Sequence, residues 1–215
     1  MNINSKSINS RFSTSAQDIL VHDITIETFS KRISEITTVY EQSFGGHPFF
    51  VKYEKGQGHE IISKHMLKPG FKPFLAHNVS GRVVGALWSD TPSLLDITSE
   101  WGEQLSKFAY EKLIEHGFFT TSQGQNKIVW EREIFIDPAY QGNGIGTQLR
   151  MRFHNYLEQH YPEGTLLLVR MRDDNVKIIT IAEKIGYQRT YIKTPSRNPD
   201  ITNDFWFKLI NHNRK

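Results

Sequence analysis

The chain of 215 residues contains no cysteine at all. This absence excludes disulfide bonds, metal sites built on thiolates, and catalysis by a cysteine nucleophile. A chain without cysteine is compatible with a reducing compartment, so we expect a cytoplasmic location.

Long apolar runs are also missing. No window approaches the roughly 18 to 20 apolar residues of a membrane helix, so no membrane partner is expected. The first 17 residues are polar, rich in Ser and Asn, and have no apolar stretch of the kind found in a signal peptide. We therefore expect a disordered tail over residues 1–17 and a single domain over residues 18–215.

An excess of charge of one sign is absent too. The formal net charge is only +3, and no run of basic residues is interleaved with aromatic ones, so nucleic acid is not an expected partner. Nine histidines occur without clustered carboxylates or thiols, so no metal site is expected. The apolar fraction of 38% and the charged fraction of 23% are those of a globular protein with a real core.

The pattern of apolar segments predicts one α/β domain, with no internal repeat and no second core. Residues 165–169 are apolar throughout, as is typical of a strand that is buried on both faces. The other expected strands are residues 19–24, 128–136, 205–210 and a segment from Tyr187, together with a hairpin at residues 74–88. The expected helices run from Thr25 or Thr28 to Gly45, and over residues 59–67, 91–116, 145–160 and 175–185.

A glycine-rich turn at residues 141–146, Gln-Gly-Asn-Gly-Ile-Gly, joins a predicted strand to a predicted helix. Glycines permit positive φ angles and carry no side chain, so successive backbone N–H groups can converge on an anion. The helix adds the unsatisfied donors of its first turn and the positive end of its dipole. The turn therefore predicts phosphate binding, with the Thr147 hydroxyl as a candidate contributor.

Three other interpretations of these glycines compete. A dinucleotide-binding fingerprint requires a third glycine where Thr147 stands, and its loop usually follows an early strand. A P-loop requires a lysine that this turn lacks. A structural turn that binds nothing is the third alternative.

Two segments around the turn narrow these alternatives. The pattern Gln141-x-x-Gly144-x-Gly146 follows Ile-Phe-Ile-Asp-Pro at residues 134–138, and residues 175–187 begin with Asn, continue with an apolar helical face and end in Gly-Tyr. Together they resemble the signature segment and a later helix of the GNAT acetyltransferase family. The hairpin at residues 78–88 is similar to the second and third strands of that family. The resemblance covers residues 72–210, with a longer helical connection than usual at residues 91–127.

The resemblance implies an α/β fold in which a mixed, mostly antiparallel central sheet is flanked by helices. It also implies that residues 128–136 and 165–169 form a splayed strand pair that holds acetyl-CoA, with the pyrophosphate on the glycine turn. The implied acetyl-CoA-binding residues are Phe135, Ile136, Gln141, Gly142, Asn143, Gly144, Ile145, Gly146, Thr147, Asn175 and Lys177. For Lys177, a solvated position on a helix is an equally open interpretation.

The implied reaction is N-acetyl transfer from acetyl-CoA to an amine by direct attack. An alkylammonium group with a pKa of about 10.4 must lose a proton first, which costs about 4.6 kcal/mol at neutral pH. Glu133 and Glu131 are the candidate bases, with Glu133 favoured, because strand alternation places both on one face beside the expected thioester. An exposed charge on a strand face is the alternative for each. A backbone N–H near Ile136 is the expected donor to the acyl oxygen.

The general acid stays unassigned, because Ala182 stands where many family members have a tyrosine. Tyr187 is a substitute only if it is not a core residue. The expected acceptor is a small-molecule amine; a protein or peptide acceptor and a non-catalytic CoA-binding module are the alternatives, and a homodimer is left open. A pocket roofed by residues 45–70 or 91–127 favours a small acceptor, whereas a groove open at both ends favours a protein. His47, Phe49 and Phe50 either line that pocket or pack in a loop.

Overall fold

The computed structural model describes residues 19–117, 127–196 and 200–211. The expected N-terminal tail, residues 1–17, lies outside the described residues. None of the helices in these ranges is both long enough and apolar enough to cross a bilayer.

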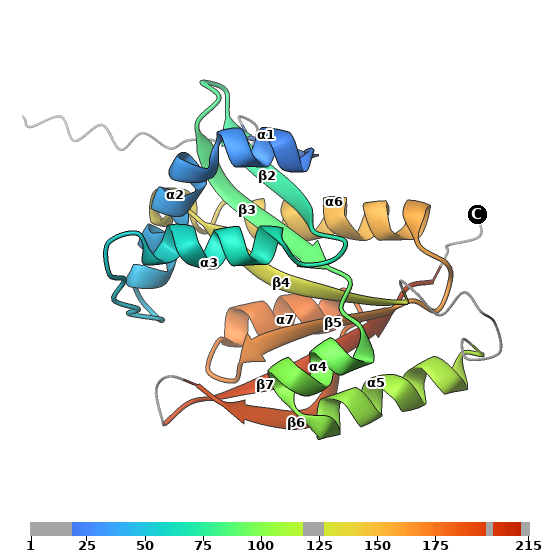
Figure 1. Cartoon of the computed structure of the whole chain (residues 1–215). Coiled ribbons are helices and arrows are strands. Elements are labelled where there is room, and N and C mark those ends of the chain that lie inside the picture. The colour runs from blue at the N-terminus through green and yellow to red at the C-terminus, as the bar shows by residue number, and fades with distance from the viewer. Residues whose placement is uncertain (1–18, 118–126, 197–199, 212–215) are drawn as a thin grey trace, which may run out of the picture.

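One twisted sheet organises the described chain (Figure 1). Its strand order is β1-β2-β3-β4-β5-β7-β6, and only the β4–β5 pair is parallel. The expectation of a mixed, mostly antiparallel sheet flanked by helices is thus confirmed. The strands are β1 (Ile19–Asp23), β2 (Lys72–Asn78), β3 (Val83–Asp90), β4 (Ile128–Ile136), β5 (Leu166–Arg172), β6 (Gln188–Pro195) and β7 (Thr202–Leu209).

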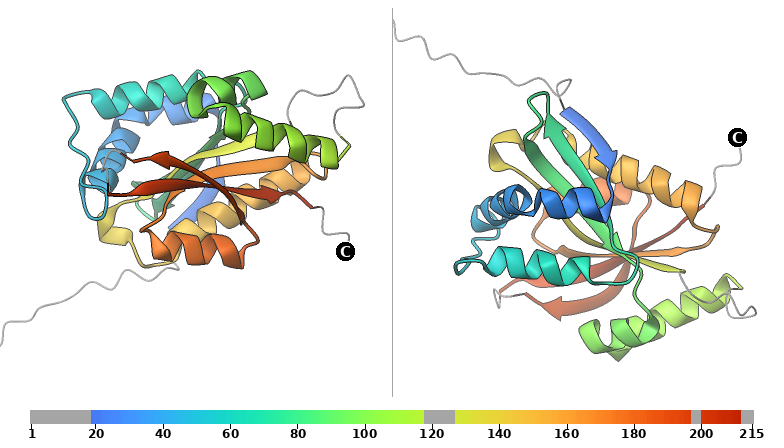
Figure 2. Two further views of the ribbon diagram at one scale, coloured as in Figure 1. Left: turned by 90° about the horizontal axis from the view of Figure 1, so that it is seen from below. Right: turned by 45° about the horizontal axis from the view of Figure 1, so that its top comes forward.

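Helices cover both faces of this sheet (Figure 2). On the face that we call the α3 face lie α1 (Ile26–Lys31), α2 (Ile33–Gly45), α3 (Gln57–Met66), α4 (Leu94–Trp101) and α5 (Glu103–Glu115). On the opposite face, the α6 face, lie α6 (Ile145–His160) and α7 (Val176–Lys184). Three groups of helices each bury a core against the sheet: α6 and α7, α1–α3, and α4 with α5. On the α3 face, the two helix groups therefore stand over different halves of the sheet.

The connection between β3 and β4 differs from the single helix expected over residues 91–116. It forms two helices that meet at Gly102, whose φ is +92°. A positive φ is incompatible with a continuous α-helix, and glycine adopts it without steric cost. The second helix therefore starts in a new direction. Ser93 caps the first one, and its side chain accepts a hydrogen bond from the backbone N–H of Asp96.

Candidate functional site

The strands β4 and β5 separate part of the way along their length. They pair only from Ile128 and Leu166 to Glu131 and Val169. Beyond these pairs β4 continues to Ile136, still paired with β3, and β5 continues to Arg172, still paired with β7. The expected splayed strand pair is therefore present. Main-chain groups that line such a wedge need hydrogen-bond partners, so the wedge suits an extended ligand.

The glycine turn follows at the end of β4. Gly142 and Gly144 have φ values of +83° and +74°, and a Cβ at either would meet no heavy atom within 4 Å. The flanking side chains hold the turn from within: Gln141 Nε2 donates to the Ile136 carbonyl at 3.1 Å, and Asn143 Nδ2 donates to the Tyr140 carbonyl at 3.0 Å. The outer surface of the turn is thus main chain without side-chain cover.

The first turn of α6 keeps its backbone donors for a ligand. Gly144 is the N-cap and has no side chain to cap the helix. Within the described ranges, the N–H groups of residues 144–147 donate to no protein acceptor. Orphan donors at the positive end of a 16-residue helix form an anion-binding site. Thr147 is half-buried beside them.

Asn175 and Lys177 lie at the start of α7 on the same face of the sheet as α6. The Asn175 side chain caps α7, because Oδ1 accepts from the Ile178 N–H at 3.4 Å. Asn175 is half-buried and Lys177 is exposed. The assignment of both residues to acetyl-CoA remains a prediction.

The two glutamates of β4 lie on opposite faces of the sheet, so the expectation that they share a face is wrong. Glu131 and Glu133 are opposite consecutive residues of β3, so β4 has one extra residue there, a β-bulge at Arg132. Glu131 contacts Arg150 of α6. Glu133 pairs with Trp88, whose side chain packs in the core under α1–α3, and opposite residues share a face. Regular alternation fails at the bulge.

Glu131 is the acceptor at the centre of a buried polar cluster. Arg150 donates to Oε1 from Nε at 2.9 Å and from Nη2 at 2.7 Å, and the Tyr187 hydroxyl donates to Oε2 at 2.8 Å. The glutamate is only 2% exposed. Both carboxylate oxygens are therefore engaged inside the α6-face core.

The polar cluster continues to His154 and Lys208. His154 Nε2 is 3.0 Å from the Tyr187 hydroxyl, and Lys208 Nζ is 3.4 Å from His154 Nδ1. Burial lowers the pKa of His154 to about 3, and the charges of Lys208 and Arg150 act in the same direction. The neutral ring accepts from the ammonium at Nδ1, so Nε2 carries the proton and donates to Tyr187.

Ala182, which occupies the position of the family's tyrosine, and the possible substitute Tyr187 are both in the core. Ala182 is fully buried, and its methyl group has no proton to donate. The Tyr187 hydroxyl already donates to Glu131, and burial raises the pKa of Tyr187 well above its ordinary value. Neither residue supplies an acid at the wedge.

On the α3 face, residues 46–56 join α2 to α3 and contact the splayed part of β5; we call them the roof loop. Arg172 Nη1 donates to the Pro48 carbonyl at 3.1 Å, and its guanidinium lies 5.0 Å from the centre of the Phe49 ring. The Phe49 ring contacts Phe44, which in turn lies 6.2 Å from Phe135 of β4. The roof loop is thus linked to both strands that border the wedge. His47 and Phe50 instead contact each other.

A stack of aromatic rings attaches α4 to the same face. The indoles of Trp101 and Trp130 are almost parallel, at 4°, with centres 5.1 Å apart. The Arg170 guanidinium lies 4.4 Å from the centre of the Trp101 ring. Arg132 binds Asp90 at 2.6 Å and also Glu100 of α4. The inserted helices are therefore fixed to β4 and β5 where the two strands part.

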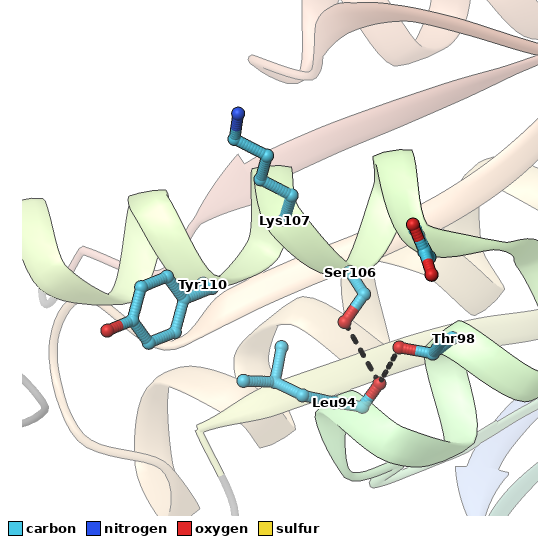
Figure 3. A pocket seen from close by; sticks show the side chains of 6 residues that line it. Leu94, Thr98, Ser106, Lys107 and Tyr110 are labelled. Atoms are coloured by element: carbon cyan, nitrogen blue, oxygen red, sulfur yellow. Dashed lines mark hydrogen bonds between the residues drawn. The ribbon is translucent and has the colours of Figure 1, made fainter.

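Two surface pockets among the described residues lie elsewhere. One lies between α4 and α5, where the Ser106 and Thr98 hydroxyls both donate to the Leu94 carbonyl (Figure 3). The other is lined by Ile185, Lys208 and residues near the end of β7. Neither includes a residue of the glycine turn or of the splayed segments, so neither is a candidate for the site of chemistry.

Several residues near the wedge were not found from the sequence. Arg150 stands on the apolar stripe of α6 beside Leu149 and Phe153, and a charge on a buried stripe is a signal of a buried partner. Arg170 and Arg172 carry no such signal, because they follow the apolar run of β5 at the point where a strand commonly ends.

Comparisons with known proteins give a clear result for the fold only. No protein-family model matches the sequence, and no curated protein matches it. The ribosomal-protein-S18-alanine N-acetyltransferase from Escherichia coli matches in structure with a TM-score of 0.60 and 11% identity, over 90% of this chain and 94% of that chain. A GNAT superfamily phosphinothricin acetyltransferase from Sinorhizobium meliloti, in complex with AcCoA, matches with a TM-score of 0.60 and 12% identity, over 92% and 91%. The ribosomal-protein-alanine N-acetyltransferase from Brucella melitensis matches at 0.58 and 13%, over 88% and 99%.

Proposed function

Since this chain has the GNAT acetyltransferase fold, we propose that it transfers an acetyl group from acetyl-CoA to the amine of a small molecule. The observation that carries the proposal is the set of backbone donors at residues 144–147, which have no protein acceptor in the described chain and lie next to a splayed strand pair. An anion site made of bare backbone donors beside an open main-chain edge fits this co-substrate better than a structural turn does.

In this proposal the glycine turn and α6 bind the pyrophosphate. The donors belong to Gly144, Ile145, Gly146 and Thr147, and Gly142 leaves room for close approach of the anion. The pantetheine arm lies along the wedge, beside Phe135 and Ile136 on β4. Asn175 and Lys177, at the start of α7, bind the arm and the phosphates. The AcCoA complex of the Sinorhizobium meliloti protein supports this choice of co-substrate.

Direct attack requires a free amine and a place for the negative charge on the thioester oxygen. The amine nitrogen forms a bond to the acetyl carbon, the carbon–sulfur bond breaks, and the products are the acetylated amine and CoA thiol. Glu133 accepts the proton that the amine must lose, and the main chain near Ile136 donates to the oxygen. Glu133 is preferred over Glu131 because both oxygens of Glu131 are engaged by Arg150 and Tyr187. The thiol is a weak acid with a pKa of about 8.5, so it needs less assistance than the amine.

The roof loop supports a small acceptor over a protein one. It lies on the α3 face and is linked to both splayed strands, to β5 through Arg172 and to β4 through Phe44 and Phe135. An extended polypeptide needs a groove that is open at both ends, and a loop attached to both strands favours a more enclosed acceptor site.

Calorimetry with acetyl-CoA, followed by a thiol-release assay with a panel of amines, tests the proposal. We expect acetyl-CoA to bind and thiol to appear only when an accepted amine is present. Absence of binding at millimolar acetyl-CoA would refute the proposal. Tight binding without thiol release from any amine would instead assign the chain as a CoA-binding module, for which Ala182 is the supporting observation.

A further inference from the structure

Beyond its last pair with β4, the strand β5 presents two arginines on the α3 face. Arg170 and Arg172 flank Met171, whose side chain is buried in the opposite, α6-face core. Alternation along the strand therefore directs both guanidinium groups toward the side of the wedge that the roof loop and α4 enclose. Arg172 binds Asp174 through two hydrogen bonds and also holds the roof loop. Arg170 is exposed.

Trp101 orients the Arg170 guanidinium. The cation lies over the Trp101 ring at 4.4 Å, and this ring is stacked on Trp130, which is 1% exposed. Phe205 of β7 contacts both indoles edge-on. A guanidinium held over an aromatic ring presents its hydrogen-bond donors in one plane, in the geometry that a carboxylate accepts. A carboxylate would therefore meet a cation that is already positioned.

Opposite charges border the wedge on this face. Glu133 stands on the β4 side and Arg170 on the β5 side. Arg132 also lies near this face, but it is only 4% exposed and binds Asp90 and Glu100. The face thus offers a carboxylate toward an ammonium group and a cation toward an anionic group of the same acceptor.

We propose that Arg170 binds a carboxylate on the acceptor, so that the substrates are amines of the amino-acid type rather than polyamines or uncharged amines. This inference rests on the proposed function and goes beyond it, because it names the second group that an acceptor must carry. Arg170 is a substrate-binding residue in this account, and Trp101 is a positioning residue that acts through it.

Steady-state kinetics with matched acceptor pairs tests this inference. The probes are the L-amino acids and the corresponding L-amino-acid amides, each assayed for thiol release at saturating acetyl-CoA. The variants are Arg170→Gln, which removes the charge, and Arg170→Lys, which keeps the charge but not the paired donors. Arg189→Gln is the matched control, because Arg189 also lies over an indole, 4.7 Å from the Trp206 ring, in a different part of the sheet.

We expect the wild type to have a higher kcat/KM for each amino acid than for the corresponding amide. Arg170→Gln should lower the acid-to-amide ratio of kcat/KM by about ten- to hundredfold, mainly through KM, while acetyl-CoA affinity stays unchanged. The ratio for Arg170→Lys should lie between those of the wild type and of Arg170→Gln, and Arg189→Gln should keep the wild-type ratio. Any difference in amine basicity between acid and amide cancels, since the ratios are compared between variants.

Three results would overturn the inference: turnover of none of the amino acids, equal use of acid and amide by the wild type, or an unchanged ratio in Arg170→Gln. A variant that loses activity equally with acids and amides would show that Arg170 only anchors α4. If acetyl-CoA still binds and other amines are turned over, the proposed function stands in each of these cases. Absence of acetyl-CoA binding would refute both this inference and the proposed function.

Discussion

Glu131 and Glu133 are two residues apart on β4, yet their side chains lie on opposite faces of the sheet. Glu131 binds Arg150 in the core under α6, and Glu133 is paired with Trp88 on the α3 face. The bulge between them allows one strand to supply a buried structural carboxylate and a carboxylate beside the wedge. It also lies where β4 parts from β5, since Glu131 is the last residue that pairs with β5.

Replacing Glu133 by Gln should slow amine acetylation without changing acetyl-CoA affinity. Loss of a general base typically lowers the rate by about 10²- to 10⁴-fold, and the loss should shrink at high pH, where the amine is already deprotonated. The measurement is kcat/KM for the acceptor across pH, with calorimetry for acetyl-CoA. The exposed residue Glu163, in the turn before β5, gives the control Glu163→Gln, which should keep the wild-type profile. An E133Q enzyme with full rate at every pH would remove Glu133 from the mechanism.

Replacing Gly144 by Ala should weaken acetyl-CoA binding by about tenfold or more. The φ of +74° at Gly144 is strained for any residue with a Cβ, at a cost of about 1–2 kcal/mol, and the methyl group would lie beside the backbone donors. Gly117 after α5 has a φ of +73° and is equally open, so Gly117→Ala imposes the same strain far from the turn. Both variants should lose similar stability in urea unfolding. Equal acetyl-CoA affinities in the two variants would argue against the assigned anion site.

Arg150→Met should lower the free energy of unfolding by about 3–5 kcal/mol, because it leaves the buried Glu131 carboxylate without its cation. Adding Glu131→Leu and Tyr187→Phe should recover part of the lost stability. These changes remove the unpaired carboxylate and the hydroxyl that would otherwise lack an acceptor. Chemical denaturation of the single and triple variants gives both values. A single variant as stable as the wild type would show that the pair contributes little to the core.

Acidification should destabilise the protein through His154. Its pKa is lowered to about 3 in the folded chain, from 6.5 as the ordinary value, by burial and by the charges of Lys208 and Arg150. The unfolded chain therefore binds a proton that the folded chain does not, and stability falls as the pH drops from 6.5 toward 3. The slope from this residue reaches about 1.4 kcal/mol per pH unit. Between pH 4 and 7, the free energy of unfolding of His154→Gln should change less steeply with pH than that of the wild type. Equal slopes would contradict the lowered pKa of His154.

Local sequence signals identified the glycine turn and the α6 start, because glycine spacing and helix onset are encoded in neighbouring residues. The splayed pair followed from the family resemblance. The bulge at Arg132 was not predictable in this way, since it appears only when β4 is aligned with β3. The break at Gly102 is not evident from the sequence, because the apolar positions of α4 and α5 together resemble one helical stripe. The contact of Arg170 with Trp101 joins residues about 70 positions apart and depends on the tertiary fold.

In the proposed function, backbone donors at the start of α6 bind the pyrophosphate of acetyl-CoA. The most direct measurement is a titration of ¹⁵N-labelled protein with acetyl-CoA, followed through its backbone amide resonances. We expect saturable shifts that are largest at residues 142–147, and we expect the matched Gly117→Ala variant to behave as the wild type does. This binding site would be contradicted if saturation left these resonances in place while others moved, or if no resonance shifted at millimolar acetyl-CoA.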